Sequence, residues 1–116
     1  MTDAVAVTRP SLLEVMDPSD LLDYALDYRC VLEPLEVISA VDWTLSAAAV
    51  SAGVEIHLQS YDDSTATVWL KVATGQQAAV AWNGEGTEIM ATCLATTSDG
   101  RIRQRAIWVT IRQRNV

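Results

Sequence analysis

The sequence predicts an all-β fold, a sandwich of two antiparallel sheets, and three observations lead to it. Apolar and polar residues alternate in several short runs, as they do in strands that bury one face. Turn-forming residues separate these runs at regular intervals. No gap between two runs is long enough for the helical crossover that parallel strands require.

The size and composition of the chain suit one folded domain. It has 116 residues, of which 50% are hydrophobic, enough for one modest core. No run approaches the roughly 20 apolar residues that cross a membrane. The first ten residues lack a basic patch followed by an apolar core, so we expect a chain made and kept in the cytosol.

Charge is unevenly distributed along the chain, whose net charge is −7. Residues 1–42 hold nine carboxylates against two arginines, whereas residues 101–114 hold five arginines and no acid. The acidic balance argues against nucleic acid as a partner, because phosphate binding needs a dominant basic face. The two charged ends suit head-to-tail contact between copies, or equally the pairing of a basic last strand with an acidic first strand.

The first 16 residues are predicted to form an N-terminal arm. Pro18 separates them from the rest of the chain, because proline lacks an N–H and biases the preceding residue towards extended geometry. The apolar side chains of the arm are candidate interface residues, namely Leu12, Leu13, Val15 and Met16. They would either pack on the same domain, as a helical turn or an edge strand, or dock on a neighbouring molecule. We favour docking, because a terminus that nothing holds usually frays. We therefore divide the chain into an arm, residues 1–16, and a sandwich domain, residues 17–116.

The first strands of the domain come after a turn at residues 17–20. Residues 22–30 alternate cleanly over nine positions, with a polar face that favours a strand over a short helix. Residues 35–45 form the next apolar stretch, in which Trp43 is expected to be a central core aromatic. Residues 47–53 are expected to be a loop or the weak end of a strand.

Two alternating runs and one short apolar run occupy the middle of the chain. Residues 54–59 predict a strand with His57 on its wet face, and residues 65–72 predict another after a turn. Trp69 falls on the polar face of that second strand, so we expect it to be exposed. Residues 78–82 are read as a short apolar strand.

Two glycine-containing pairs predict tight hairpins. An Asn-Gly pair at residues 83–84 and an Asp-Gly pair at residues 99–100 each stand beside strand-like runs. Residues 89–96 alternate, and residues 102–111 form a final strand rich in β-branched side chains. About seven short antiparallel strands result, the pattern of an immunoglobulin-like β-sandwich, with a barrel as the nearest alternative.

Two cysteines, Cys30 and Cys93, each lie on the apolar side of a predicted strand. In a cytosolic protein we expect two buried free thiols, and a disulfide between the sheets is the alternative. Two cysteines and one histidine are too few for a typical structural zinc site.

The residue types that catalysis needs are not grouped in the sequence. His57 is the only histidine, and on a polar strand face a surface residue is far commoner than a base. No serine or cysteine has a base beside it in sequence. Asp62, Asp63 and Asp99 offer oxygens for Ca²⁺, but aspartates in turns are mostly turn formers. We therefore expect neither an enzyme nor a cofactor or metal site.

Three arginines and two tryptophans are the remaining interface candidates. Arg101, Arg103 and Arg105 recur every second residue and so share one face of the final strand. The apolar end of that strand continues the same face, which suggests a twist or bulge between the two parts. The arginines are either a solvated edge that blocks aggregation or a row that grips a partner's carboxylates. Trp69 and Trp82 are the aromatic candidates.

Several short motifs occur in an order that resembles a known protein family. They are Asp17-Pro18, Leu22-Asp23-Tyr24, Leu26-Asp27-Tyr28, Trp43, Ala66-Thr67-Val68-Trp69-Leu70, Thr96-Thr97-Ser98-Asp99-Gly100-Arg101 and Arg105-Ala106-Ile107. Over roughly residues 17–111 the chain resembles the fiber–tail adaptors of tailed bacteriophages, small virion proteins with an immunoglobulin-like fold. Residues 71–73 replace the small, glycine-rich turn of the family, and residues 83–86 interrupt a strand that is usually continuous. Those two loops are therefore expected to contact something particular to this phage.

The resemblance implies a structural virion protein that joins tail fibers or a collar to the head–tail connector or tail. Its partners would be connector or portal, tail or fiber proteins, with neither nucleic acid nor membrane. It would be assembled in the host cytoplasm as a homo-oligomer or multi-copy ring in the neck or tail. The alternative is an immunoglobulin-like binding module that recognises a carbohydrate or a host surface protein, and it predicts a monomer with an exposed aromatic patch at Trp69 or Trp82.

Overall fold

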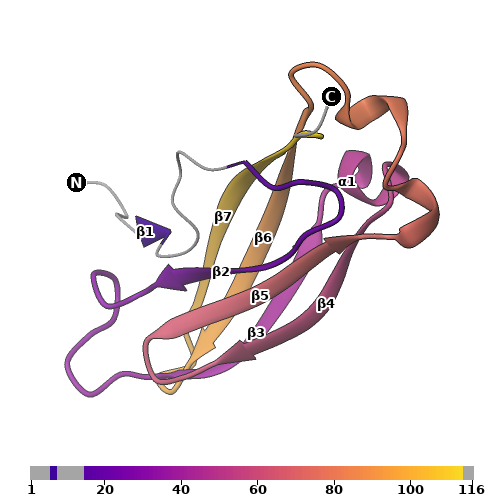
Figure 1. Cartoon of the computed structure of the whole chain (residues 1–116). Helices are drawn as coiled ribbons and strands as arrows, with labels where there is room; N and C mark the ends of the chain where they lie inside the picture. The colour runs from indigo at the N-terminus through magenta and orange to yellow at the C-terminus, as the bar shows by residue number, and fades with distance from the viewer. Residues whose placement is uncertain (1–5, 8–14, 114–116) are drawn as a thin grey trace.

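Two antiparallel sheets face each other in a computed structural model, which describes residues 6–7 and 15–113 (Figure 1). One sheet has the strand order β1-β2-β5-β4 and the other the order β3-β6-β7. The strands are β1 (Ala6–Val7), β2 (Leu21–Asp27), β3 (Ile38–Leu45), β4 (Val54–Tyr61), β5 (Thr65–Val72), β6 (Thr87–Thr97) and β7 (Ile102–Ile111). This order is that of a constant-type immunoglobulin domain, so the predicted all-β sandwich of about seven strands is confirmed.

The core lies between the sheets because alternate side chains of each strand point inward. On β5 every second residue from Ala66 to Val72 is buried, and β6 repeats the pattern from Ile89 to Thr97. Trp43 is 2% exposed and pairs directly with Cys93 across β3 and β6. The expectation that Trp43 is a core aromatic is therefore confirmed.

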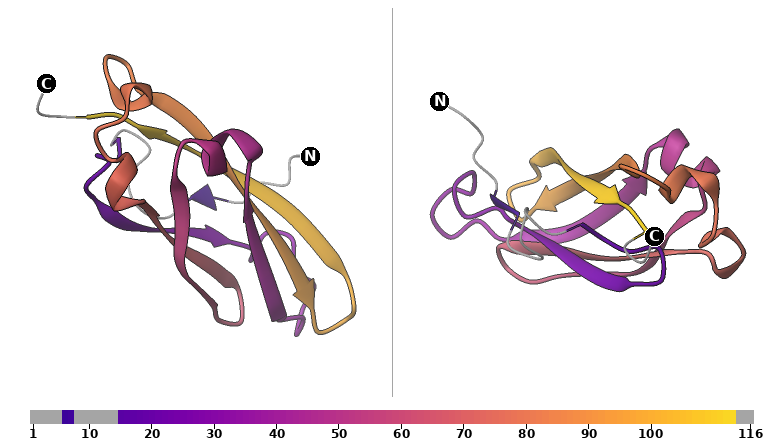
Figure 2. Two further views of the ribbon diagram at one scale, coloured as in Figure 1. Left: turned by 90° about the vertical axis from the view of Figure 1, so that its right-hand side faces the viewer. Right: turned by 45° about the horizontal axis from the view of Figure 1, so that its top comes forward.

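Three short helical segments, and not a strand, occupy the end of the sandwich where β3 ends and β6 begins (Figure 2). They are α1 (Ala47–Ser51), η1 (Thr74–Gln76) and η2 (Val80–Trp82). The strand expected over residues 78–82 is therefore wrong, because a short apolar run without alternation does not distinguish a strand from a helical turn. The hairpin expected at residues 83–84 is wrong as well, since that turn leads from η2 into β6. No helix among the described residues is long and apolar enough to cross a membrane.

The described parts of the predicted arm belong to the sandwich. Strand β1 pairs with the end of β2, and Met16 forms a parallel bridge with Ile111 of β7. The N–H of Met16 donates to the carbonyl of Thr110 at 3.0 Å, and its side chain is fully buried. This burial corrects the expectation that Met16 docks on a neighbour. Val15 is half-buried, and Leu12 and Leu13 lie outside the described residues.

The hairpin at residues 99–100 is confirmed. The N–H of Gly100 donates to the carbonyl of Thr97 at 2.9 Å, and Gly100 adopts the positive φ that such a turn requires. From this turn β6 and β7 pair without a register shift, so the bulge suggested for the last strand is not present.

The expectation of two buried free thiols holds for Cys93 only. Cys30 is free and exposed, because β2 ends at Asp27, whose carboxylate accepts the N–H of Arg29 at 3.0 Å and starts a turn. Cys93 is free and buried, and burial raises the pKa of its thiol to about 11. Burial likewise raises the pKa of the phenol of Tyr28, its neighbour in the core.

Candidate interface at the loop end of the sandwich

Three connections meet at one end of the sandwich, at the lower left of Figure 1. We call this the loop end; it comprises residues 28–37, 62–64 and 98–101. Backbone bonds join the three connections. The N–H of Tyr28 donates to the carbonyl of Ser64 at 2.7 Å, and that of Ser98 to the carbonyl of Val37 at 2.8 Å. The first and last of these connections correspond to loops that antibody variable domains use for binding.

The longest connection, residues 28–37, is anchored by buried groups. Tyr28 is fully buried, and Glu36 is only 5% exposed. The carboxylate of Glu36 accepts the N–H of Glu33 at 2.8 Å and the hydroxyl of Thr97, and it lies 3.9 Å from the guanidinium of Arg101. These contacts, the Glu33 N–H first among them, hold the pKa of Glu36 below its usual value. The connection is thus fastened to the end of β6 and to the turn that leads into β7.

A tight turn at residues 33–36 forms the tip of this connection. The N–H of Glu36 donates to the carbonyl of Glu33 at 2.9 Å, with Pro34 and Leu35 between them. Leu35 has φ 68°, the one positive value found for a non-glycine residue in the described ranges. Glycine is preferred at that position of such a turn, and an L-residue there costs roughly 1–2 kcal/mol. Leu35 is also 99% exposed, so the fold gains no burial from its side chain.

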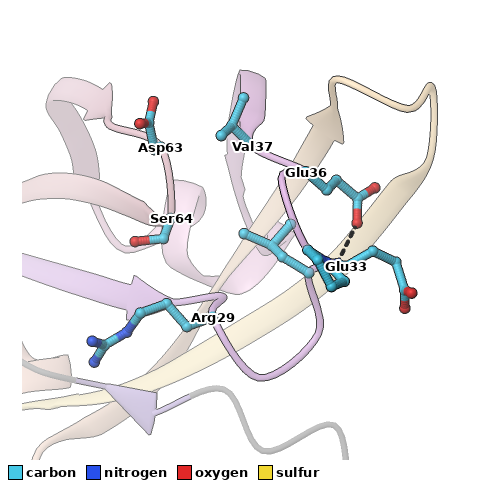
Figure 3. Close-up of a pocket in the computed structure, with 8 residues that line it drawn as sticks. Arg29, Glu33, Glu36, Val37, Asp63 and Ser64 are labelled. Atoms are coloured by element: carbon cyan, nitrogen blue, oxygen red, sulfur yellow. Dashed lines mark hydrogen bonds between the residues drawn. The ribbon is translucent and has the colours of Figure 1, made fainter.

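A hollow of about 400 Å³ lies beside this turn (Figure 3). Its apolar wall and its polar rim are formed by Arg29, Leu32, Glu33, Pro34, Glu36, Val37, Asp63 and Ser64. Arg29 is tied to Asp27 through a hydrogen bond of 2.8 Å, which lowers the pKa of that carboxyl. Glu33, Glu36 and Asp63 bring three carboxylates to the hollow. Arg29 is paired with Asp27, and Arg101 alone lies near both Glu33 and Glu36, so the hollow keeps a net negative charge.

The predicted arginine row faces inward and supports the loop end. In the regular register with β6, Arg103 lies opposite Ala95, and Arg105 lies opposite Cys93, on the buried face of that strand. Both arginines are half-buried, and Arg103 reaches the carbonyl of Val31 at 3.5 Å. The expectation of a fully solvated edge is therefore corrected for these two side chains, because both lie on the inward face of β7 and Arg103 contacts the connection at residues 28–37.

Arg101 differs from the other two arginines because it stays on the surface. Its side chain is 47% exposed, and its guanidinium lies 3.8 Å from Glu33 and 3.9 Å from Glu36. The pair of Arg101 with Glu33 is exposed on both sides, and such a pair contributes little to stability, whereas the carboxylate of Glu36 is buried. Arg101 remains a candidate contact residue.

The two predicted aromatic candidates are not the most exposed tryptophans. Trp82 is fully buried, and its indole N–H donates to the carbonyl of Gln76 at 2.8 Å, which corrects its assignment to an interface. Trp69 is half-buried on the central strand β5. Trp108, which the sequence pattern did not single out, is 58% exposed on the outer face of β7. Strand alternation places Trp108 on the opposite face of β7 from the arginines, and this alternation could have indicated its exposure from the sequence.

The outer face of the three-stranded sheet carries further exposed apolar side chains. Ile102 is 62% exposed, and Leu94 is 37% exposed on the neighbouring strand. They point to the same side as Trp108, since all three occupy the outward positions of β6 and β7. We call Leu94, Ile102 and Trp108 the outer apolar face.

The described residues offer surfaces for binding and no grouping of possible metal ligands. Within the ranges that the structure describes, no three His, Cys, Asp or Glu side chains are grouped so that they could hold a metal ion. His57 is exposed on the edge strand β4, as expected.

Comparison with known proteins gives one match. A family model described as podophage GP4 fiber-tail adaptor protein gp77 matches residues 16–110. The matched span runs from the buried Met16 through almost all of β7, so it includes both sheets and the loop end. No curated protein and no solved structure matches the chain.

Proposed function

Because the chain belongs to the podophage fiber–tail adaptor family, we propose that it joins tail fibers or a collar to the head–tail connector or tail. The family is one of structural virion proteins, and its role implies binding to other proteins of the phage tail. The observation that carries the proposal is the continuous match over residues 16–110, which covers both sheets and the connections between them.

The shape of the molecule supports a joining role. Its extents are 48 × 23 × 19 Å, so its two ends are well separated. Leu35 is exposed at the loop end, and Val80 is 82% exposed in η2 at the opposite end. An adaptor needs at least two surfaces for different proteins, and exposed apolar side chains at both ends of a rigid body provide them.

We further propose that the protein is present in several copies at the neck or tail. The acidic first third and the exposed arginines at the two ends of the last strand, Arg101 and Arg112, would allow successive copies to meet with opposite charge. Residues 1–14, with Leu12 and Leu13, remain proposed contacts with a neighbour, together with Val15, Trp69 and Arg101. Arg103 would act indirectly, because its guanidinium reaches the carbonyl of Val31 in the loop end, and Arg105, half-buried on the same inward face, is no longer proposed as a contact.

The test uses particles of the phage with this gene deleted. We expect particles that lack fibers in electron micrographs and regain both fibers and infectivity when the purified chain is added. A variant without residues 1–14 keeps Met16 in the core but removes β1, so its melting temperature is compared with that of the wild type before a loss of fibers is assigned to contacts of the N-terminal segment. Fibers present at normal occupancy on particles without the protein would overturn the proposal.

The alternative, a free module that binds a carbohydrate or a host surface protein, lacks a comparable observation. It required an exposed aromatic patch at Trp69 or Trp82, and the first is half-buried and the second fully buried. Sedimentation of the purified chain, alone and with connector protein, would distinguish the two functions, because only an adaptor would co-sediment with the connector.

A further inference from the structure

We propose that Leu35 is a docking knob, which inserts into an apolar socket flanked by basic side chains on a different protein of the virion. This inference rests on the proposed adaptor function and names the chemistry of one of its partners. Three observations support it: the conformation of Leu35, the rigidity of its turn and the charge of its surroundings.

The position of Leu35 is unfavourable for the folded chain taken alone. Its side chain is 99% exposed, and its backbone has φ 68°, which glycine would adopt without strain. Single exposed leucines are common on protein surfaces, but this one combines exposure with a left-handed backbone. Strained backbone of this kind is concentrated at binding and switch sites, where the side chain has a use. That use lies outside the chain, because inside it Leu35 is not buried against anything.

The turn that carries Leu35 is held in one geometry before any partner binds. The carboxylate of Glu36 closes the turn by accepting the N–H of Glu33 at 2.8 Å. The same carboxylate accepts the hydroxyl of Thr97, and Arg101 lies 3.8 Å from Glu33 and 3.9 Å from Glu36. A loop that is already ordered loses little conformational entropy on binding, so an anchor on it is effective.

The surroundings of Leu35 determine the chemistry of the partner. The acidic hollow beside the turn has an apolar wall that includes Leu32 and Val37, and carboxylates at Glu33 and Asp63. A lysine or arginine of the partner would lay its methylene groups along this wall and its charge beside the carboxylates. The socket for Leu35 itself must be apolar, because leucine offers no hydrogen bond. We therefore assign a socket with a basic rim and not a second acidic surface.

The experiment measures incorporation into particles that lack this gene product. Purified wild-type chain and the variants Leu35→Gly and Leu35→Asn are titrated against these particles, and bound chain is quantified after sedimentation. Both variants remove the leucine side chain, and both residues tolerate a positive φ. The matched control is Leu58→Thr, which removes a leucine that is 54% exposed on β4.

We expect Leu35→Gly and Leu35→Asn to bind at least about tenfold more weakly, the effect of leaving one leucine side chain unburied. Their melting temperatures should equal or exceed that of the wild type, and Leu58→Thr should bind as the wild type does. Binding of the wild type should weaken as salt is added, because the basic rim meets exposed carboxylates.

Different failures are distinguishable. If the wild type does not bind the particles, the adaptor function falls, and this inference falls with it. If the wild type binds and both Leu35 variants bind equally well, only the docking knob is refuted. A melting temperature lowered in both variants would show that Leu35 serves the fold. Leu35-dependent self-association of the wild type in sedimentation would overturn the assignment to a different protein.

Discussion

Trp82 and Trp108 should respond very differently to alanine substitution. Trp82 is fully buried, and its indole N–H donates to the carbonyl of Gln76 at 2.8 Å. Its backbone carbonyl also accepts the N–H of Gln113 at 2.8 Å, so it ties the end of the chain to η2. Replacement of a buried tryptophan by alanine costs about 3–5 kcal/mol. Trp108 is 58% exposed, and its replacement should cost about 1 kcal/mol or less.

These free energies translate into melting temperatures that circular dichroism measures easily. For a chain of 116 residues, the unfolding entropy makes 1 kcal/mol worth about 4 °C. We therefore expect Trp82→Ala to melt about 12–20 °C below the wild type and Trp108→Ala within about 4 °C of it. Trp82→Phe keeps most of the buried ring and loses the hydrogen bond, so it should fall between them.

Equal melting temperatures for the two alanine variants would refute this reasoning. They would mean that η2 does not cover the end of the core, and that Trp82 is free to serve as the interface residue that it was predicted to be. Reversible unfolding is checked by a second scan of each sample, so that the comparison concerns stability and not aggregation.

Three further predictions concern a thiol, a carboxyl and a turn. Burial raises the pKa of Cys93 to about 11, whereas Cys30 is exposed. At pH 8 a thiol reagent should therefore label Cys30 rapidly and Cys93 only after denaturation. Rapid labelling of both thiols in the folded protein would contradict this. The pKa of Glu36 is held low in the folded state, so its contribution to stability is present above about pH 4.5 and lost as the pH falls through the folded value. Glu36→Gln should therefore reduce the acid-side loss of stability in melting scans from pH 6 to pH 3, and an unchanged profile would count against it. In Gly86→Ala the new Cβ would lie 2.2 Å from a carbonyl oxygen of β7, whereas in Gly100→Ala it would meet nothing within 4 Å. Both glycines have positive φ, so the backbone strain is matched and Gly86→Ala should have the clearly lower melting temperature. Equal melting temperatures would show that turn strain alone matters.

Much of the sheet structure was predictable because strand alternation and turn chemistry are local properties. The strands over residues 65–72 and 102–111 have the bounds that their alternation predicts. The Asp-Gly pair at residues 99–100 forms the expected hairpin, because few residue types accept the positive φ that this turn needs. The order of short motifs also indicated the family, and the matched span of residues 16–110 agrees closely with the expected 17–111.

The candidate interface was predicted less well because burial depends on residues far apart in the sequence. Residues 78–82 have no alternation, so their pattern does not show that Trp82 turns inward to cover the core. Arg103 lies inward because the carbonyl of Val31, 72 positions earlier, is there to receive its guanidinium. The alternation of the strand does place Arg103 in phase with the buried Ile107 and Val109, but the contact that accommodates its charge there depends on a residue far away along the chain.

The sequence by itself determined the fold class, the positions of most strands and the family, since each depends on residue types at short spacing. Only the tertiary structure decided which side chains are free to contact a partner. Leu35 illustrates the difference, because nothing local distinguishes it from a buried leucine. Its exposure results from contacts of Glu36 with the hydroxyl of Thr97 in β6 and with the guanidinium of Arg101 just before β7, more than 60 positions away along the chain.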